Sequence, residues 1–232
     1  MKKSDFVHSI FSSVADKYDL MNNLMSFGIH HFWKNELLKE ISLKDDFSLL
    51  DVAGGTGDIA SRVLKKFCSS AVTICDNNFA MIEHGIKKTT NAGHASIKWL
   101  CGDAQKLPIM NEQYDYYTIA FGIRNVSNID FALEEAYRVL KPGGKFVCLE
   151  FSEIEDNVIL SKIYDMYSDY IIPMLGKAVT GNKEAYQYLV DSIRAFPSQE
   201  HFAKLINNAG FANVSFRNLS CGITAIHTGW KV

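Results

Sequence analysis

A glycine-rich stretch at residues 49–58 constrains the fold of this chain more than any other feature. It reads Leu-Leu-Asp-Val-Ala-Gly-Gly-Thr-Gly-Asp, so apolar residues lead to Asp51 and then to three glycines within four positions. The pattern predicts a buried strand, a tight turn and the start of a helix. Glycines let the backbone approach a ligand closely, and the free N–H groups of a helix start attract electron-rich ligand groups. Such a turn after a first strand typically binds a nucleotide-like cofactor.

Asp51 distinguishes between two classes of cofactor. The spacing Gly55-x-Gly57-x-x-Ala60, with Asp76 about 20 residues further on, also satisfies the dinucleotide fingerprint, and glycines can serve a tight turn alone. A carboxylate at the end of a buried strand is costly without a cationic or hydrogen-bonding partner. S-adenosylmethionine (SAM) offers an ammonium and a sulfonium there, whereas a pyrophosphate would be repelled. The turn is therefore predicted to hold SAM through Asp51, Gly54, Gly55 and Gly57.

Strands and helices alternate from residue 48 onward, which calls for a parallel sheet with helices on both faces. Strands are expected at 48–53, 71–75, 97–101, 116–121 and 145–151, and helices at 58–67, 78–89 and 128–140. Pro142-Gly143-Gly144 is expected to end the third helix and to lead into the next strand.

The C-terminal part of the chain predicts the rest of the sheet. A helix at 198–208 precedes two strands at 214–219 and 224–230, and so short a connection between them requires a hairpin with one antiparallel strand. We therefore predict a doubly wound, mostly parallel seven-stranded sheet with a C-terminal antiparallel hairpin. This is the Rossmann-like α/β fold of class I SAM-dependent methyltransferases, and dinucleotide-binding folds lack that ending.

Three acidic residues follow three successive predicted strands. In an open parallel sheet, ligands bind beyond the carboxyl ends of the strands. Besides Asp51, Asp76 is placed to accept hydrogen bonds from both ribose hydroxyls of a nucleoside. Asp103 is placed to meet the exocyclic amine of adenine, with the backbone N–H of Ala104 facing the ring.

Length and composition indicate one domain. The chain has 232 residues, 47% of them hydrophobic, enough for a full core without disulfides or a structural metal. We expect a single methyltransferase domain over 1–232, with an N-terminal helical lid at 1–45 and a helical insertion at 154–195 over the substrate site. The lid is predicted from the helical spacing of apolar residues between Phe6 and Tyr18.

Charge and cysteine content exclude several classes of site. The net charge of −2 gives no basic footprint for nucleic acid, and five widely spaced cysteines suit a reducing compartment rather than disulfides or zinc. Adjacent side chains diverge on a helix or strand, so His30 and His31 form a poor metal site and no metal is expected.

No apolar run reaches the roughly 18 residues of a membrane span, and the N-terminus does not read as a secretory signal. We expect a cytoplasmic protein, peripheral at the membrane at most.

Five segments of the chain match one known family. They are 18–33 (Tyr-Asp-x-Met-Asn-x-x-Met-Ser-x-x-x-His-x-x-Trp), 138–152 (Arg-Val-Leu-Lys-Pro-Gly-Gly-x-Phe-x-x-Leu-Glu-x-Ser), 53–58, 121–126 and 229–231. Through them the chain resembles the ubiquinone/menaquinone biosynthesis C-methyltransferases (UbiE/MenG) over essentially its whole length. Position 120 departs from the pattern, because relatives often have serine where this chain has Ala120.

The resemblance implies SAM-dependent methylation of a ring carbon on a polyprenylated hydroquinone. The acceptor would be demethylmenaquinol, 2-polyprenyl-6-methoxy-1,4-benzoquinol or both. The resemblance also implies that Thr56, Asp76, Asp103 and Ala104 contact the cofactor. An apolar path for the prenyl tail is expected along Phe6–Tyr18 and Ile159–Leu175, with peripheral membrane contact and a homodimer as further expectations.

Arg124 and Asn125 are the predicted catalytic residues. An arene carbon is a weak nucleophile until the neighbouring phenol, of pKa about 10, loses its proton. The Arg124 guanidinium is too basic to take that proton, so we expect it to stabilise the phenolate and hold a water. The alternative is that Arg124 only pairs with an acid such as Glu150 or Asp19. Asp19 and His30 are weaker candidates for accepting the proton.

Three rival functions stay open at this point. One is a methyltransferase of the same fold that acts on a sterol or a soluble phenol. Another is a nicotinamide-dependent oxidoreductase, which Asp51 and the terminal hairpin disfavour. The last is a non-catalytic binding module that kept the cofactor crevice, which the intact Arg124-Asn125 pair disfavours.

Overall fold

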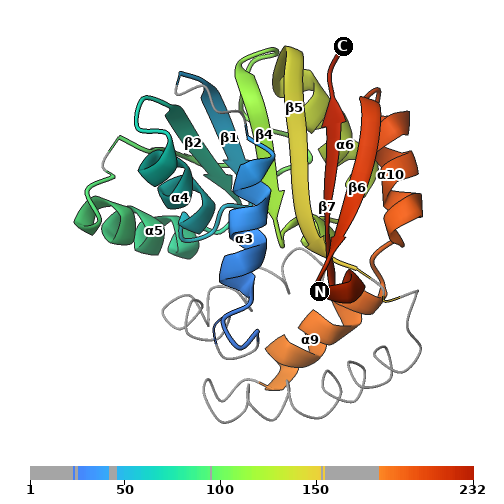
Figure 1. The fold of residues 1–232 in the computed structure, drawn as a ribbon. Coiled ribbons are helices and arrows are strands. Elements are labelled where there is room, and N and C mark those ends of the chain that lie inside the picture. The colour runs from blue at the N-terminus through green and yellow to red at the C-terminus, as the bar shows by residue number, and fades with distance from the viewer. Residues whose placement is uncertain (1–22, 24–25, 42–45, 95, 153, 155–182) are drawn as a thin grey trace.

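The computed structural model describes residues 23, 26–41, 46–94, 96–152, 154 and 183–232 of the chain. A seven-stranded sheet in the order β3-β2-β1-β4-β5-β7-β6 forms its centre (Figure 1). The strands are β1 (Ser48–Val52), β2 (Ala71–Asp76), β3 (Lys98–Cys101), β4 (Tyr114–Ala120), β5 (Leu140–Phe151), β6 (Ala212–Leu219) and β7 (Thr224–Trp230). The strands from β1 to β5 pair in parallel, and β7 is antiparallel to both of its neighbours. The predicted fold class is confirmed.

Helices cover both faces of the sheet. They are α3 (His30–Lys39), α4 (Asp58–Lys66), α5 (Phe79–Asn91), α6 (Ile129–Val139), α9 (Lys183–Arg194) and α10 (Gln199–Asn208). The first three lie on one face, and α6 and α10 lie on the other (Figure 1). Each of these five helices turns apolar residues to the sheet; α6, for example, buries Ala132, Leu133, Ala136 and Val139.

The alternation of side chains along the strands produces two apolar layers. Leu49 and Leu50 of β1 are both fully buried, Leu49 among side chains of α3 and α4 and Leu50 among those of α6 and α10. A parallel strand with helices on both faces has no solvent side, so it reads as a continuous apolar run. This explains why the strand before the glycine turn carries only one charged residue, Asp51, near its end.

The transition from α6 to β5 differs from the prediction. Helix α6 ends at Val139, and β5 begins at Leu140, ahead of the Pro-Gly-Gly turn that was expected to separate them. Leu140 pairs with Tyr114 and Lys145 pairs with Tyr116, so residues 141–144 bulge out of the strand. Gly143 has a φ of +79°, which glycine adopts without strain. The turn signal was real, but it marks a bulge within a strand.

The predicted lid at 1–45 and insertion at 154–195 lie largely outside the described residues. Helices α3 and α9 are the described helices of these two segments, and α9 lies across the carboxyl ends of the strands (Figure 1). The predicted prenyl path along Phe6–Tyr18 and Ile159–Leu175 lies wholly outside them. Within the described ranges, no helix combines the length and the apolar character that crossing a bilayer requires.

Candidate active site

The glycine turn adopts the predicted arrangement of strand, turn and helix. Ala53 follows β1 with a φ of +52°, and Gly57, with a φ of +79°, is the N-cap of α4. The Gly57 N–H donates to the Gly54 carbonyl oxygen at 2.9 Å, which closes the turn. A positive φ is strained for alanine, so the backbone is held in an unusual path where β1 leaves the sheet.

Asp51 lies buried beneath this turn. One oxygen, Oδ1, accepts a hydrogen bond from the Thr118 hydroxyl at 2.8 Å. The other, Oδ2, is also buried and accepts no hydrogen bond from any residue that the structure describes. Burial raises the pKa of the Asp51 carboxyl to about 7, and the Thr118 hydrogen bond only partly opposes this shift. A buried carboxylate oxygen without a donor favours a cationic ligand group nearby.

Gly54 is packed against this carboxylate. A Cβ on Gly54 would lie 2.7 Å from Ile74 Cγ2 and 2.9 Å from Asp51 Oδ2, closer than real contacts allow. We expect Gly54→Ala to lower the free energy of unfolding by about 1–3 kcal/mol, as overpacking does, and to weaken cofactor binding because the turn must shift. Urea unfolding and calorimetric titration of the same sample measure both effects. Unchanged SAM affinity in the variant would contradict a close approach of the cofactor to this turn.

Asp76 ties the glycine turn to the start of α5. Its Oδ2 accepts from the Gly55 N–H at 2.9 Å, and its Oδ1 accepts from the Asn78 N–H at 2.8 Å. Asn78 in turn caps α5, because its Oδ1 accepts from the Met81 N–H at 3.2 Å. A carboxylate oxygen has more than one acceptor site, so Asp76 can hold this backbone and still accept from ribose hydroxyls.

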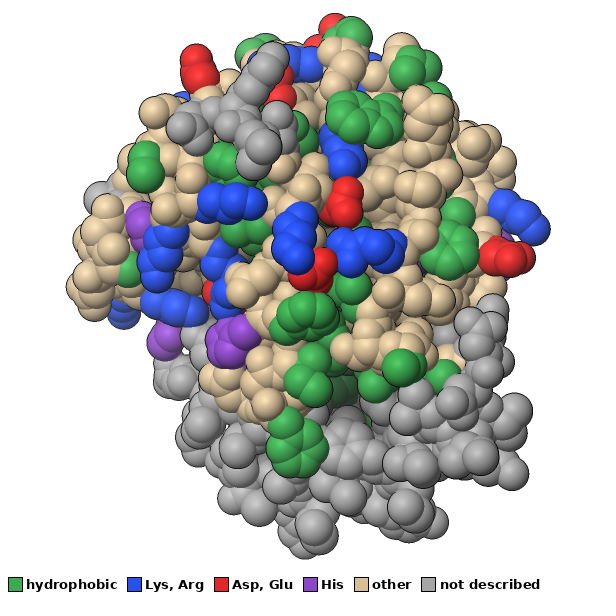
Figure 2. Space-filling model, in the orientation of Figure 1, with side chains coloured by type: hydrophobic (Ala, Val, Ile, Leu, Met, Phe, Trp, Pro, Cys, Tyr) green, Lys and Arg blue, Asp and Glu red, His purple; other side chains and the backbone are tan. Residues whose placement is uncertain are grey.

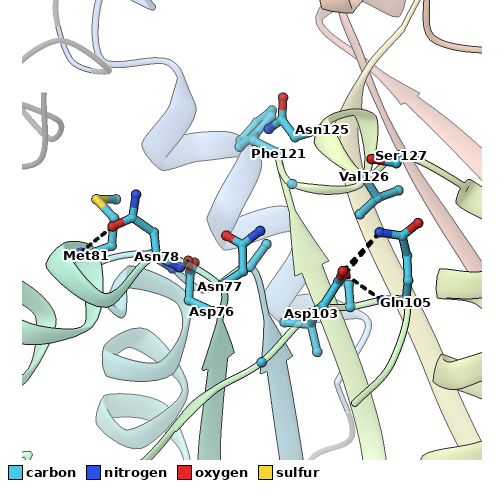
Figure 3. A pocket seen from close by; sticks show the side chains of 16 residues that line it. Asp76, Asn77, Asn78, Met81, Asp103, Gln105, Phe121, Asn125, Val126 and Ser127 are labelled. Carbon is cyan, nitrogen blue, oxygen red and sulfur yellow. Dashed lines mark hydrogen bonds between the residues drawn. The ribbon is translucent and has the colours of Figure 1, made fainter. Parts of the chain in front are cut away.

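Asp103 is held in a second cluster across the pocket (Figure 3). The Gln105 amide nitrogen donates to both Asp103 oxygens at 3.1 and 3.2 Å, and the Gln105 backbone N–H donates to Oδ1 at 2.9 Å. Gln105 is fixed in turn, because its Oε1 accepts from the Asn128 N–H at 2.9 Å. The carboxylate is exposed and oriented, as recognition of an amine requires.

One pocket joins the ends of four parallel strands (Figure 3). It is lined by residues 52, 53 and 55 at the end of β1, 76–78 and 81 at the end of β2, 102–105 after β3, and 121, 122 and 125–127 after β4. Five of the predicted site residues are therefore brought together: Gly55, Asp76, Asp103, Ala104 and Asn125. Asp51, Gly54, Thr56, Gly57 and Arg124 do not line it.

Thr56 does not line the pocket and contacts α5. Its side chain is buried, and its Oγ1 accepts from the Lys88 ammonium at 3.2 Å. The side chain thus links the turn to α5.

Arg124 is buried in an ion pair at the end of β4. A short 3-10 helix, η2 (Ile123–Asn125), follows Phe121, whose φ of +57° repeats the strained strand ending seen at Ala53. Arg124 Nη1 donates to Glu150 Oε1 at 2.6 Å and to the Phe121 carbonyl oxygen at 2.7 Å. The pairing with Glu150 that the sequence left open is therefore present, and it anchors η2 to β5.

An aromatic cluster adjoins the pocket beside this ion pair. The rings of Phe121 and Phe151 lie 4.9 Å apart between centroids, and Trp33 of α3 lies 6.0 Å from each. The Arg124 guanidinium lies 5.3 Å from the centre of the Phe151 ring, a cation–π contact. An apolar wall suited to a ring or a hydrocarbon chain therefore begins at Phe121, which lines the pocket.

The expectation that His30 and His31 diverge is wrong. Their rings lie 4.0 Å apart, both Nε2 atoms contact Asn23 Oδ1, and Asp58 offers a third ligand atom within 4.8 Å. Asp58, however, accepts from Lys34 at 2.7 Å and from Arg62 at 2.8 Å, so two cations already neutralise it, which disfavours a metal ion.

His30 is also a poor proton acceptor. Burial, followed by the charge of Lys34, lowers the pKa of His30 to about 4, and the residue does not line the pocket. The other weak candidate, Asp19, lies outside the described residues.

Sequence reasoning missed three residues of the site. Asn78 and Gln105 each stand two positions after a predicted acid, a spacing at which a backbone N–H can return to the carboxylate, so a local signal was available. Tyr188 of α9, whose hydroxyl lies 3.2 Å from Asn125 Oδ1, is far away in the sequence and had no such signal.

Comparison with known proteins agrees with this geometry. A profile described as the ubiE/COQ5 methyltransferase family matches residues 1–231. The chain is 50% identical over 236 residues to the ubiquinone/menaquinone biosynthesis C-methyltransferase UbiE of Rickettsia akari, covering 100% of this chain and 94% of that protein. It is 45% identical over 266 residues to the mitochondrial 2-methoxy-6-polyprenyl-1,4-benzoquinol methylase of Rattus norvegicus. This match covers 100% of this chain and 81% of that protein.

A solved structure shares the fold at much lower identity. A SAM-dependent methyltransferase from Thermotoga maritima superposes with a TM-score of 0.70 at 20% identity, covering 97% of this chain and 100% of that one. At this identity the likeness establishes the fold, and the chemistry must be argued from the site.

Proposed function

The chain belongs to the ubiE/COQ5 methyltransferase family, and from this premise we propose that it methylates a ring carbon of a polyprenylated hydroquinone. The observation that carries the proposal is the match over residues 1–231 to a family whose relatives are named for this reaction. The pocket at the strand ends also supports the proposal, because Asn125 and the aromatic wall that begins at Phe121 lie beside the predicted cofactor-binding residues. It suits a small aromatic acceptor next to SAM.

We assign the cofactor half of the pocket to the residues around β1, β2 and β3. SAM, when bound, supplies a methyl group on a sulfonium, which is an electrophile. Gly55 leaves room for a ligand at the turn, Asp76 can accept from ribose hydroxyls, and Asp103, oriented by Gln105, can accept from the adenine amine. The buried Oδ2 of Asp51 supplies the negative charge that favours the cationic methionine part.

The acceptor half lies around η2. Transfer of the phenolic proton to water makes the neighbouring ring carbon nucleophilic, and loss of the ring proton after methylation restores the aromatic ring. The enzyme must therefore stabilise a phenolate and hold the carbon about 3 Å from the methyl group. Asn125 lines the pocket and can donate to the phenolate oxygen. Arg124 fixes η2 through Glu150 and the Phe121 carbonyl, and its guanidinium keeps positive charge next to this site.

A transfer assay tests the proposal. Purified protein is given SAM labelled in its methyl group, with short-chain demethylmenaquinol and 2-polyprenyl-6-methoxy-1,4-benzoquinol offered in separate reactions under reducing conditions. We expect label in one or both quinols, and the ratio of kcat/KM identifies the preferred ring. Cofactor binding without label in either quinol would overturn the proposed acceptor class and leave the fold assignment intact.

We further propose peripheral contact with an anionic bilayer through α3 and α4. Lys and Arg side chains gather over these two helices, with hydrophobic side chains toward the end where the strands terminate (Figure 2). Phe27 and Ile29, which precede α3, and Phe32, in its first turn, expose 78%, 45% and 51% of their surfaces. Exposed apolar side chains on the same face as lysines are typical of surfaces that bind anionic lipid.

Vesicle sedimentation tests this surface. We expect the protein to bind phosphatidylcholine vesicles containing about one-third phosphatidylglycerol, and to bind pure phosphatidylcholine and high-salt samples weakly. Lys65→Glu/Lys66→Glu should reduce binding by about tenfold or more, at roughly 1 kcal/mol for each lysine. The control Lys98→Glu/Lys204→Glu has the same charge change at exposed positions on β3 and α10. Equal losses in both double variants would remove α3 and α4 from the proposal.

A further inference from the structure

A tyrosine on α9 contacts the pocket residue Asn125. This residue, Tyr188, lies on the helix that crosses the carboxyl ends of the strands (Figure 1) and contacts η2. Its hydroxyl lies 3.2 Å from Asn125 Oδ1, and its side chain is half-buried. A hydroxyl oxygen can donate or accept, whereas an amide oxygen only accepts, so the tyrosine is the donor in this contact.

This hydrogen bond determines which way the Asn125 carboxamide faces. The two ends of an amide have almost the same shape and are told apart by their hydrogen-bond partners. With Oδ1 engaged by Tyr188, the amide nitrogen lies on the side of Phe121, which lines the pocket (Figure 3). In the opposite orientation an oxygen would face the pocket and repel a phenolate.

The helix that carries Tyr188 is held by packing, as a positioning role requires. Val190 of α9 is buried, and Phe196, just beyond the helix, lies 5.0 Å from the ring of Phe202 on α10. Burial raises the pKa of the Tyr188 hydroxyl, so the group keeps its proton over the pH range of enzyme assays. Arg124 and Glu150 lie near enough to act on it electrostatically with opposite signs.

We propose that Tyr188 is a positioning residue, whose hydroxyl holds the Asn125 carboxamide with its N–H groups toward the phenolic oxygen of the acceptor. This inference rests on the proposed function. It assigns α9 a part in the reaction, since the helix closes over η2 and supplies the group that orients a pocket side chain. The donor would then be aligned before the acceptor arrives, which is how preorganised dipoles stabilise a developing anion.

A double-mutant cycle tests the inference. The variants are Tyr188→Phe, Asn125→Leu and the two combined, each assayed with SAM and short-chain demethylmenaquinol across pH. Removal of an oxyanion donor typically costs about 10²–10³ in kcat, which we expect for Asn125→Leu. Tyr188→Phe should lose about tenfold in kcat with little change in the acceptor KM, and its pH profile should move to higher pH. The double variant should be no slower than Asn125→Leu alone, because the hydroxyl acts only through the amide.

Tyr137→Phe is the matched control. Tyr137 packs against Phe211 at 5.2 Å on the α6 and α10 side, away from the pocket, so its kcat and pH profile should match the wild type. A readout without turnover is the side-chain ¹⁵N–¹H₂ signal of Asn125, assigned by its absence in Asn125→Leu. It should shift in Tyr188→Phe and stay in place in Tyr137→Phe.

Two results would overturn the inference while the wild type still methylates the quinol. One is a Tyr188→Phe variant that matches Tyr137→Phe in kcat, pH profile and amide signal. The other is additive losses in the double variant, which would mean that the two side chains act independently. A wild type that labels no quinol overturns the proposed function itself, and the amide signal then still reports whether Tyr188 orients Asn125.

Discussion

Replacing Asp51 with asparagine is expected to raise the melting temperature of the cofactor-free protein and to abolish most of its affinity for SAM. Burial raises the pKa of this carboxyl from 3.8 to about 7, so at neutral pH and above the folded protein holds a buried charge that the unfolded chain would solvate. Each pKa unit corresponds to about 1.4 kcal/mol, so the carboxyl costs the folded state up to roughly 4 kcal/mol. The asparagine in the Asp51→Asn variant would keep an acceptor for Thr118 without that charge.

The pH dependence of this effect has a definite sign. A carboxyl whose pKa is raised on folding favours the folded state most below about pH 4, and this contribution is lost as the pH rises to about 7. The melting-temperature difference between Asp51→Asn and wild type should therefore grow from about pH 4 to about pH 7 and then level off. Thermal unfolding of the cofactor-free proteins at a series of pH values measures it.

Cofactor affinity should show the complementary dependence. The cationic methionine part of SAM favours the ionised carboxylate, so wild-type affinity should rise with pH to about 7, by at most about tenfold per unit, and then level off. Calorimetric titration between about pH 5.5 and about pH 7.5 should find this slope in the wild type and none in Asp51→Asn. A variant that binds SAM as tightly as the wild type would show that Asp51 does not balance the charge of the cofactor.

The second large effect is expected at the Arg124–Glu150 pair. Both side chains are buried, and burial raises the pKa of Glu150 although Arg124 opposes the shift. Removing one partner of a buried ion pair typically costs about 3–5 kcal/mol, whereas replacing both with apolar residues is often neutral. Arg124→Met and Glu150→Met should each be destabilised by that amount, and Arg124→Met/Glu150→Met should regain most of it in urea unfolding.

The Arg124→Met/Glu150→Met variant should not regain turnover when it regains stability. The double variant lacks the Arg124 hydrogen bond to the Phe121 carbonyl and the positive charge beside the acceptor half, so we expect kcat to stay at least about 100-fold below wild type. Arg124→Lys keeps the charge but loses the planar guanidinium. Its kcat should lie between that of the double variant and that of the wild type. Near wild-type turnover in either the double variant or Arg124→Lys would show that the pair only holds the fold together.

Local patterns in the sequence were enough to predict the helices and strands of the fold. The apolar run before Asp51, the glycines after it and the two strands flanking residues 220–222 each report on neighbouring residues, and the sheet has the predicted strands and the predicted antiparallel ending. The errors fall where a local signal had two meanings. Pro142-Gly143-Gly144 marks a turn, but only the pairing of Lys145 with Tyr116 shows that the turn is a bulge inside β5.

The site was harder to predict because its contacts join distant segments. Asp76, Asp103 and Ala104 could be placed because parallel strands end at one edge of a sheet. The orientation of Asn125 depends on Tyr188, 63 positions away, and the burial of Arg124 depends on Glu150, 26 positions away. His30 and His31 converge because both reach Asn23, which the rule for adjacent side chains does not include.

The position of the new methyl group tests the proposed carbon methylation most directly. The protein is incubated with SAM carrying a ¹³C-methyl group and with the quinol that the transfer assay identifies, and the product is examined by ¹³C NMR. A phenolate can react at oxygen or at the adjacent ring carbon, and the two products have well-separated methyl signals. We predict that the ¹³C-enriched methyl group is on the ring carbon and that no enriched O-methyl signal appears. Label on a phenolic oxygen would contradict the proposal, because the acceptor half would then direct the oxygen, and not the carbon, toward the cofactor.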